Sequence, residues 1–344
     1  MSAKKVTMTD IARDAGVGIA TVDRVLNKRA AVKESTERKV LESARRLGFA
    51  LEQSHYRLAA GQSAIALRMG FILLQPSHSF YQQLAQALEQ AALAWHSPTQ
   101  APVFLHYDIN AIDDMAAAIA RLSAEVDVIG IVALDNPLIR HALIQAIDKG
   151  VHVFTLLSDM SIPQRTGYIG LDNQKAGRTA GWAVDRLCHG DGKIGIIVGD
   201  NRFICQESCE ISFRSYLREQ GKGDRVLEPV RNHERADVAR QVTEEMLQQY
   251  PDLKAIYAPC GGVEGIVDAL RARQRQHRVT LICHGPIDNG ELALIDGTVD
   301  LMLAHRLSDF AAATINAFIQ AASQPQATFI NALQPFDLLT KENL

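Results

Sequence analysis

Residues 6–49 read VTMTDIARDAGVGIATVDRVLNKRAAVKESTERKVLESARRLGF, and this stretch decides how the start of the chain folds. Thr7, followed by Asp10 three residues later, is a capping-box start for a first helix that ends at Gly16. A tight glycine-containing turn then leads into a second short helix, Ile19–Leu26. Two short helices joined by such a turn are the helix-turn-helix pattern.

A third helix, from about Ser35 to Leu47, is expected to complete a small core. The apolar residues of the three segments recur at helical spacing. The residues expected in this core are Ile11, Ala12, Ala15, Val22, Val25, Leu26, Val40, Leu41, Ala44 and Leu47.

A core this small could also belong to a generic helical cap. The distribution of charge along the chain distinguishes that alternative from a nucleic-acid-binding unit. Residues 1–63 hold 12 Lys+Arg and 7 Asp+Glu, a net charge of +5, whereas the remainder holds 24 and 32, a net charge of −8. The attraction for phosphates therefore lies in the N-terminal unit, which favours nucleic acid as its partner.

The run TMTDIARDAGVGIATVDRVLN, followed by VKESTERKVLESARRLGF, resembles the N-terminal module of the lac repressor (LacI/GalR) family of bacterial transcription regulators. The resemblance implies that Ile19–Leu26 is a recognition helix in the major groove of DNA. The DNA-binding residues that it implies, with one in the linker described below, are Thr9, Gly18, Ile19, Ala20, Thr21, Asp23, Arg24, Asn27 and Leu58.

Within this set, Arg24 suits bidentate contact with guanine, and Ile19 and Ala20 offer apolar contact such as that to a thymine methyl group. Two residues depart from the family pattern. Asp23 replaces a small hydroxyl residue, and its carboxylate either pairs with a basic neighbour or accepts from a cytosine amino group. Gly18 replaces the usual serine, which removes one capping bond worth ~1 kcal/mol.

Residues 49–63, FALEQSHYRLAAGQS, stand where the family has a hinge helix that orders on operator DNA. Leu58 and Gly61 match the leucine and glycine of that hinge, whereas Leu51 and Glu52 are among the residues that depart from it. A leucine inserted into the minor groove kinks DNA. Leu58 is the candidate for this role, and the alternative is that it packs the linker onto the core.

The remainder of the chain alternates continuous apolar runs, such as MGFILL and KIGIIVG, with helical stretches. This alternation predicts parallel sheets covered by helices on both faces, in two successive doubly wound α/β sets. The resemblance implies a two-lobed, periplasmic-binding-protein-like (type I) core. The expected domains are a helix-turn-helix in 1–48, a linker in 49–65, and a core in 66–344. By analogy the first lobe covers about 66–172 and 306–327, and the second covers 173–305 and 328–344.

In open α/β sheets, ligands lie beyond the carboxyl ends of the strands. The polar and aromatic residues that follow the predicted strands here could each be an ordinary loop residue, but together they predict one effector cleft. With the family positions added, the candidate effector-binding residues are Ser77, Phe80, Tyr81, Asp135, Asn136, Asp159, Arg202, Cys209, Cys260, His284 and His305.

The ligand class follows from departures from the family pattern. His284 stands where the family commonly has an aspartate that grips sugar hydroxyls, and His305 where it often has glutamine. Two histidines with Arg202 and Arg306 nearby would suit an anionic group, as in a sugar acid or sugar phosphate. A neutral sugar or polyol remains the alternative.

Other functions find little support in the sequence. It has no 18-residue apolar run, no charged leader, no phosphate-binding P-loop and no HExxH helix. Five scattered cysteines without zinc spacing predict reduced thiols and no metal site. We therefore expect no enzyme activity, no cofactor and no membrane partner.

The prediction from these features is a cytoplasmic, nucleoid-associated transcriptional regulator, a repressor that binds a pseudopalindromic operator as a homodimer. No leucine heptad tail follows Leu339, which favours a dimer over a tetramer. The alternative class is a transport-type solute-binding or sensor protein without DNA regulation.

Overall fold

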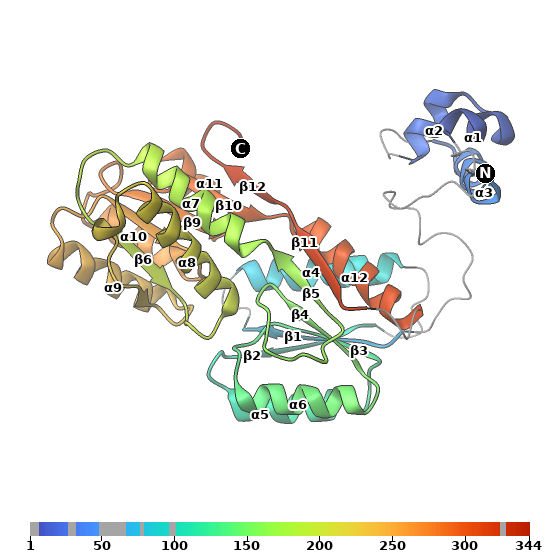
Figure 1. Ribbon diagram of the computed structural model, residues 1–344, viewed down its shortest axis with the longest axis horizontal. Helices are drawn as coiled ribbons and strands as arrows, with labels where there is room; N and C mark the ends of the chain where they lie inside the picture. The colour runs from blue at the N-terminus through green and yellow to red at the C-terminus, as the bar shows by residue number, and fades with distance from the viewer. Residues whose placement is uncertain (1–6, 27–31, 48–66, 76–78, 96–100, 324–327) are drawn as a thin grey trace. The chain divides into compact units, whose positions relative to one another are not determined.

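The computed structural model describes residues 7–26, 32–47, 67–75, 79–95, 101–323 and 328–344 (Figure 1). The chain forms two compact units. The first comprises Met1–Ile65 and Trp95–Ser97, and the second comprises Ala66–Ala94 and Pro98–Leu344. The expected linker, 49–65, and three candidate site residues, Asn27, Leu58 and Ser77, lie outside the described residues.

The first unit contains the three expected helices, α1 (Met8–Ala15), α2 (Ile19–Leu26) and α3 (Glu34–Arg46). The capping box is present: the Thr7 side chain accepts from the Asp10 backbone N–H, and the Asp10 carboxylate accepts from the Thr7 backbone N–H. Gly16 ends α1 with a φ of 66°, the left-handed conformation in which glycine is least strained. The helix-turn-helix prediction is confirmed.

Apolar side chains from all three helices form the core of this unit. Ile11, Val22, Val40 and Ala44 are fully buried in it. The expected core members Ala15 and Leu47 are only partly buried, because each lies at the edge of the cluster.

One polar cluster fastens α3 to α1. The Ser43 hydroxyl donates to Asp14 Oδ2 over 2.5 Å, and the Arg46 guanidinium also donates to that oxygen over 2.5 Å. These two donors, Ser43 first, lower the pKa of Asp14. The expected bounds of α3, Ser35 to Leu47, are one residue later than the observed ones.

The second unit alternates strands and helices along the chain. Its first part contains β1 (Met69–Leu74), α4 (Ser79–Ala94), β2 (Val103–Tyr107), α5 (Ile112–Leu122), β3 (Val128–Ile131), α6 (Pro137–Asp148), β4 (His152–Leu156) and β5 (Gly167–Leu171). Its second part contains α7 (Asn173–Leu187), β6 (Ile194–Val198), α8 (Ile204–Glu219), η1 (Gly223–Arg225), β7 (Val230–Arg231), α9 (Ala236–Gln249), β8 (Ala255–Ala258), α10 (Val263–Ala272), β9 (Thr280–Gly285), α11 (Gly290–Ile295) and β10 (Leu301–His305). The chain then continues through α12 (Leu307–Ser323), β11 (Ile330–Gln334) and β12 (Phe336–Leu339).

Two six-stranded sheets result, with the strand orders β11-β5-β4-β3-β1-β2 and β12-β10-β9-β8-β6-β7. All neighbouring pairs are parallel except β10 and β12, which are antiparallel. The central strands are buried on both faces, as their uninterrupted apolar sequences predict. The doubly wound, two-lobed fold class is confirmed.

Helices cover both faces of each sheet (Figure 1). In the first lobe, α5 and α6 pack on one face, and α4 and α12 lie together on the other. There Phe71 stacks on Phe318 with ring centroids 5.5 Å apart. In the second lobe, α7 and α8 pack on one face, and α9 and α10 on the other.

The division of the C-terminal segment between the lobes differs from the prediction. Residues 328–344 were all expected in the second lobe, but β11 pairs in register with β5 of the first sheet. Only β12 belongs to the second sheet. The chain therefore passes between the lobes at Asp172, near Arg306 and at Pro335, because β11 completes the edge of the first sheet before the chain leaves it.

Candidate functional site

The N-terminal end of α2 presents an unusually apolar surface. Ile19 is 51% exposed, whereas Val22, three residues later, is fully buried. Gly18, Ala20 and Arg24 are also exposed, and Thr21 and Asp23 are half-buried. Thr9 is exposed on α1. The predicted DNA-reading side chains of α2 therefore lie on the side of the helix that the core leaves open.

A cavity of about 110 Å³ lies between the two lobes of the second unit. Its walls combine aromatic and apolar side chains with a few polar ones, as is usual for small-molecule sites. The first lobe contributes Phe80, Tyr81, Leu157 and Leu171, and the second lobe contributes most of the rest. The remaining lining residues are Asn173, Cys205, Gln206, Cys209, Glu234, Pro259, Cys260, Gly261, Gly262, Glu264, His284, Gly285, Pro286, Ile287 and His305.

The structure brings six of the candidate effector residues together around this cavity. They come from α4, α8 and the ends of three strands of the second sheet, and they are Phe80, Tyr81, Cys209, Cys260, His284 and His305. The strand-end rule thus leads to the cavity at β8, β9 and β10, where the parallel strands end at one edge.

The two histidines are neutral hydrogen-bonding groups at the cavity wall. His284 Nε2 lies 3.0 Å from the hydroxyl of Tyr257, which is buried beneath it. The His305 ring lies edge-on to Phe80, with the ring centroids 5.5 Å apart. Burial lowers the pKa of His284 to about 3 and that of His305 to about 4, so neither ring is charged near neutral pH.

Glu234 is a cavity residue that sequence reasoning missed. Its side chain accepts from Gln206 Nε2 over 2.8 Å and from the Gly261 backbone N–H over 2.9 Å. Both His233 and Glu234 have positive φ, 54° and 60°, which is a strained conformation for non-glycine residues. Two adjacent left-handed residues are not readable from sequence pattern, so nothing marked this loop as part of the site.

Glu264 is the second missed carboxylate. It lies in the first turn of α10, two residues beyond Gly262, whose left-handed backbone begins that helix. Its Oε1 accepts from the Asp288 backbone N–H over 2.9 Å. Its Oε2 is buried and has no hydrogen-bond partner among the residues that the structure describes. The signal that could have found it is its place just after β8, beside Cys260.

Four candidate effector residues do not line the cavity, because other parts of the protein engage them. Asp135 forms an ion pair with Arg140 over 3.0 Å, and Asn136 caps α6 by accepting from the Leu138 N–H over 2.8 Å. Arg202 is paired with Asp200 over 2.8 Å.

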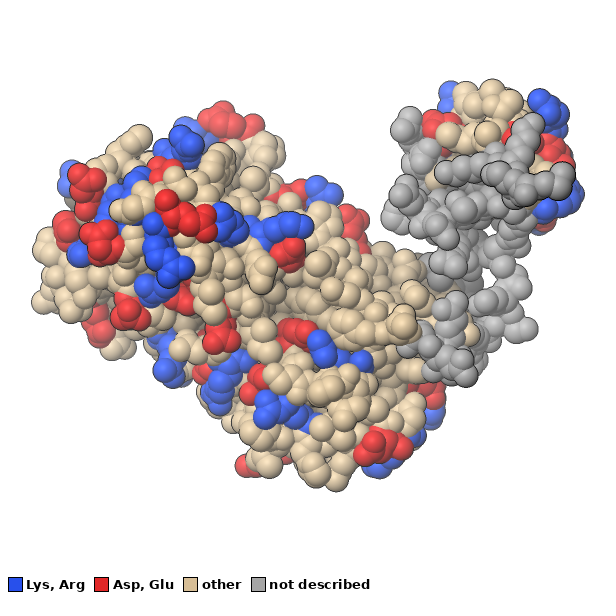
Figure 2. Space-filling model, viewed as in Figure 1, with Lys and Arg blue, Asp and Glu red and all other residues tan. Residues whose placement is uncertain are grey.

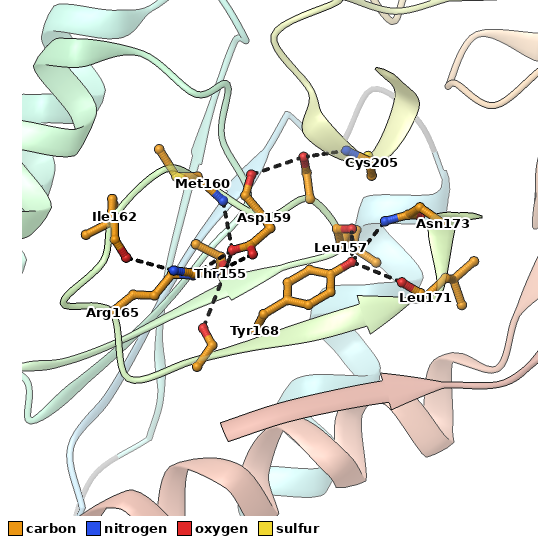
Figure 3. Close-up of polar contacts among 12 residues, drawn as sticks. Thr155, Leu157, Asp159, Met160, Ile162, Arg165, Tyr168, Leu171, Asn173 and Cys205 are labelled. Carbon is orange, nitrogen blue, oxygen red and sulfur yellow. Dashed lines mark hydrogen bonds and ion pairs between the residues drawn. The ribbon is translucent and has the colours of Figure 1, made fainter. Parts of the chain in front are cut away.

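The fourth, Asp159, is held by several donors around it (Figure 3). The Arg165 guanidinium donates to both of its carboxylate oxygens, over 2.7 and 2.6 Å. The Thr155 hydroxyl and the Met160 backbone N–H also donate to it. Some polar residues at strand ends therefore line the cavity, and others form hydrogen bonds that hold a loop in place.

Hydrogen bonds from backbone N–H groups connect the two lobes. The Asp135 N–H donates to the Arg202 carbonyl over 3.0 Å, and the Cys205 N–H donates to the Ser158 hydroxyl over 3.3 Å. Close by, Tyr168 donates its hydroxyl hydrogen to the carbonyls of Leu157 and Leu171 and accepts from Asn173 (Figure 3). The crossover into α7 is thus fixed next to the cavity.

The cysteines at the cavity are unreactive thiols. All five cysteines of the chain are free. Burial raises the pKa of Cys205 to about 12, and it raises the pKa values of Cys209 and Cys260 as well. Since the thiolate is the nucleophile and metal ligand, these residues contribute polarizable surface to the cavity.

The arginines expected to favour an anionic ligand do not face the cavity. Arg202 is neutralised by Asp200, and Arg306 donates to Asp337 on β12. Among the described residues that line the cavity, there is no lysine or arginine. The basis for an anionic ligand is therefore removed by these two ion pairs.

Comparison with known proteins identifies both units. The family model described as "Periplasmic binding protein domain" matches residues 69–326, and the model described as "Bacterial regulatory proteins, lacI family" matches residues 7–50. The chain belongs to the periplasmic binding protein domain family, and its N-terminus is a lacI-family module.

The lacI-family assignment is supported by curated relatives. Catabolite control protein A of Priestia megaterium is 40% identical over 87 residues, which are 25% of this chain and 25% of the relative. The maltose regulon regulatory protein MalI of Escherichia coli is 33% identical over 90 residues, 26% of this chain and 25% of the relative. These alignments span about a quarter of the relatives' length.

Solved structures match the periplasmic binding protein domain. The glucose-galactose binding protein GanP of Geobacillus stearothermophilus superimposes with a TM-score of 0.70 at 19% identity, covering 80% of this chain and 99% of that one. A solute binding protein from Agrobacterium vitis with bound D-fucose gives a TM-score of 0.73 at 17% identity, covering 80% and 96%. At these identities the likeness concerns the fold.

Proposed function

We propose that this protein is a ligand-controlled transcriptional regulator that represses its genes by binding a pseudopalindromic operator as a homodimer. The observation that carries the proposal is a lacI-family module in which Ile19 and Arg24 of α2 are both exposed. Exposed apolar and arginine side chains on one short helix suit contact with base edges in the major groove.

In this proposal, the second unit binds the effector that controls the affinity of the protein for DNA. A small sugar or polyol in the cavity between the lobes contacts both of them and so changes the angle between the lobes. The linker of residues 49–65, which follows the helix-turn-helix of residues 1–48, passes this change to the DNA-binding module. Coupling free energies of about 1–3 kcal/mol are typical of such allostery.

Surface charge agrees with a division of labour between the units. On the face of the two-lobed unit shown in Figure 2, basic and acidic side chains are interspersed, without a large patch of one sign. The net charge of that part of the chain is negative, whereas residues 1–63 carry +5. Attraction to DNA phosphates is therefore assigned to the N-terminal unit.

The protein is proposed to act in the cytoplasm, in association with the nucleoid, and not as an enzyme. The relatives named above are regulators and sugar-binding proteins. None of the helices in the described segments has the length and apolar content needed to traverse a lipid bilayer.

The test is selection of bound sequences from a random duplex pool by the full chain, followed by affinity measurements across a salt series. We expect enrichment of a pseudopalindrome and an affinity that falls by about 10³-fold or more between 50 and 200 mM salt, as several phosphate contacts require. A transport-type solute-binding protein would enrich no sequence. Absence of binding to any duplex at low salt would refute the proposal.

A further inference from the structure

One residue that lines the cavity, Glu264, has an acceptor atom for which the described part of the protein supplies no donor. Glu264 Oε1 is satisfied by the Asp288 N–H, but Oε2, in the same carboxylate, is buried and has no partner among the described residues. A buried polar atom without a hydrogen bond costs on the order of 1–3 kcal/mol. A bound molecule that brings a donor to Oε2 would recover this free energy.

The charges of the residues around the cavity indicate which charge the ligand can carry. Glu234 and Glu264 both line it, and the described part of its lining contributes neither lysine nor arginine. The two histidines are neutral near pH 7 because of their burial. The anionic group of a sugar acid or sugar phosphate would bring no donor to Oε2 and would be repelled by the two carboxylates, in a site where the effective dielectric constant is well below that of water.

A second residue with an unpartnered atom and two aromatic side chains line the same cavity. His305 Nδ1 is buried without a hydrogen-bond partner in the described structure. The ring of His305 packs edge-on to Phe80, whose own ring lies 5.1 Å from that of Tyr81. Oriented polar atoms beside aromatic side chains suit a molecule with hydroxyl groups on a carbon ring.

We propose that Glu264 accepts a hydrogen bond from a hydroxyl or ammonium group of the effector, and that the cleft takes neutral or amine-bearing polyols and rejects sugar acids and sugar phosphates. This inference rests on the proposed ligand-controlled function, and it replaces the expectation of an anionic ligand. Glu264 then acts as the carboxylate that determines specificity, in a site where His284 stands at the position at which the family commonly has an aspartate.

The experiment measures binding of matched sugar series to the purified full chain by calorimetry and thermal shift. Each series contains a parent hexose, its amino derivatives at different carbons, its aldonic acid and its 6-phosphate, for glucose, galactose and mannose. In the series that binds, we expect the best amino derivative to bind about tenfold tighter than the parent hexose. The acid and the phosphate should bind at least about tenfold more weakly than the parent hexose.

The matched variant is Glu264→Gln, which keeps the shape of the side chain and removes its charge. We expect it to remove the preference for the amino derivative, so that amine and parent hexose bind with similar affinity. Glu291→Gln is the control, because Glu291 is an exposed carboxylate on the nearby helix α11. The control should retain the wild-type ranking.

Three outcomes would overturn the inference: an acid or phosphate that binds tighter than its parent hexose, an unchanged amine preference in Glu264→Gln, or no binding by any compound at about 10 mM. Operator binding by the same preparations is measured in parallel without sugar. If the duplex binds but the ranking fails, the ligand class is wrong and the regulator proposal stands. If no duplex binds, the regulator proposal itself fails.

Discussion

In the proposed DNA-binding role, we expect sequence-specific reading by α2 to depend most on the side chain of Arg24. It is exposed on the same helix as Ile19, and its fork of donors matches the O6 and N7 acceptors of guanine. We predict that Arg24→Ala lowers affinity for the selected operator by about 1–3 kcal/mol and relaxes base preference at one position of each half-site. Competition among single-base operator variants measures this change.

The matched control for this prediction is Lys39→Ala, which removes one exposed positive charge from α3. It should weaken binding to all duplexes alike, since a contact with phosphate carries no sequence information. If Arg24→Ala also weakened all duplexes equally, Arg24 would be a phosphate contact.

The neutral cavity histidines make stability depend on pH. Burial lowers the folded-state pKa of His305 to about 4, below its ordinary value of 6.5. As pH falls below 6.5 the unfolded chain takes up a proton that the folded chain refuses, so stability falls. The loss attributable to His305 between pH 7 and pH 5 should approach 2 kcal/mol. Denaturant unfolding at both pH values should show a smaller difference for His305→Asn than for the wild type.

The same shift predicts how effector binding responds to pH. Because both histidines stay neutral in the folded protein well below pH 6, affinity for an uncharged polyol should stay constant between pH 6 and pH 8. A titration midpoint near 6.5 in the binding profile would contradict the assigned burial of these rings.

At the scale of elements, α7 and α8 approach each other through a glycine. A side-chain methyl group at Gly177 would overlap the carbonyl oxygen of Cys209 in α8. We predict that Gly177→Ala lowers the free energy of unfolding by about 1–3 kcal/mol, the usual cost of overpacking. It should also weaken sugar binding, because α8 carries Cys205, Gln206 and Cys209 into the cavity.

Gln174→Ala is the control for the helix pair, since Gln174 is exposed on α7. Chemical denaturation and calorimetry of both variants provide the comparison. If Gly177→Ala were as stable as this control, the two helices could separate without cost, and the predicted link between their packing and the cavity would be wrong.

Elements with a strong periodic pattern could be predicted from the sequence, and those without one could not. The three N-terminal helices and nine of the strands follow uninterrupted or regularly spaced apolar runs. The strand β7 has two residues and is only partly buried, so it leaves no such signal. The strand β11 alternates half-buried and exposed residues, and β12, after Pro335, is mostly half-buried, so neither has the continuous buried run of a central strand and nothing local shows that they belong to different sheets.

The cavity was predictable where strand ends supply it and at family positions such as Cys209 of α8. Cys260, His284 and His305 follow or end buried strands, and the rule for parallel sheets locates them. The same rule also selects Asp135 and Asp159, whose charges are taken up by Arg140 and Arg165. Which of two polar residues finds an internal partner depends on tertiary geometry, and no local pattern records it.

At the scale of the whole molecule, ligand and DNA should be linked through one coupling free energy. If a sugar from the tested series changes operator affinity by a given factor, the operator must change affinity for that sugar by the same factor. We predict a factor between about 5 and 150 in both directions. Calorimetric titration of the sugar with and without operator duplex checks this equality, and a sugar that binds without altering operator affinity would contradict the proposed control.

The strands β11 and β12 allow the last part of the chain to complete the edges of both sheets. With Pro335 alone between them, one strand closes the border of the first sheet and the other covers the open border of β10 in the second. A chain truncated after Gln334 would keep the first sheet complete but would leave the backbone amides and carbonyls on one edge of β10 unpaired. An unpaired edge strand of this kind can pair with a strand of another molecule. Versions shortened in this way should therefore tend to self-associate.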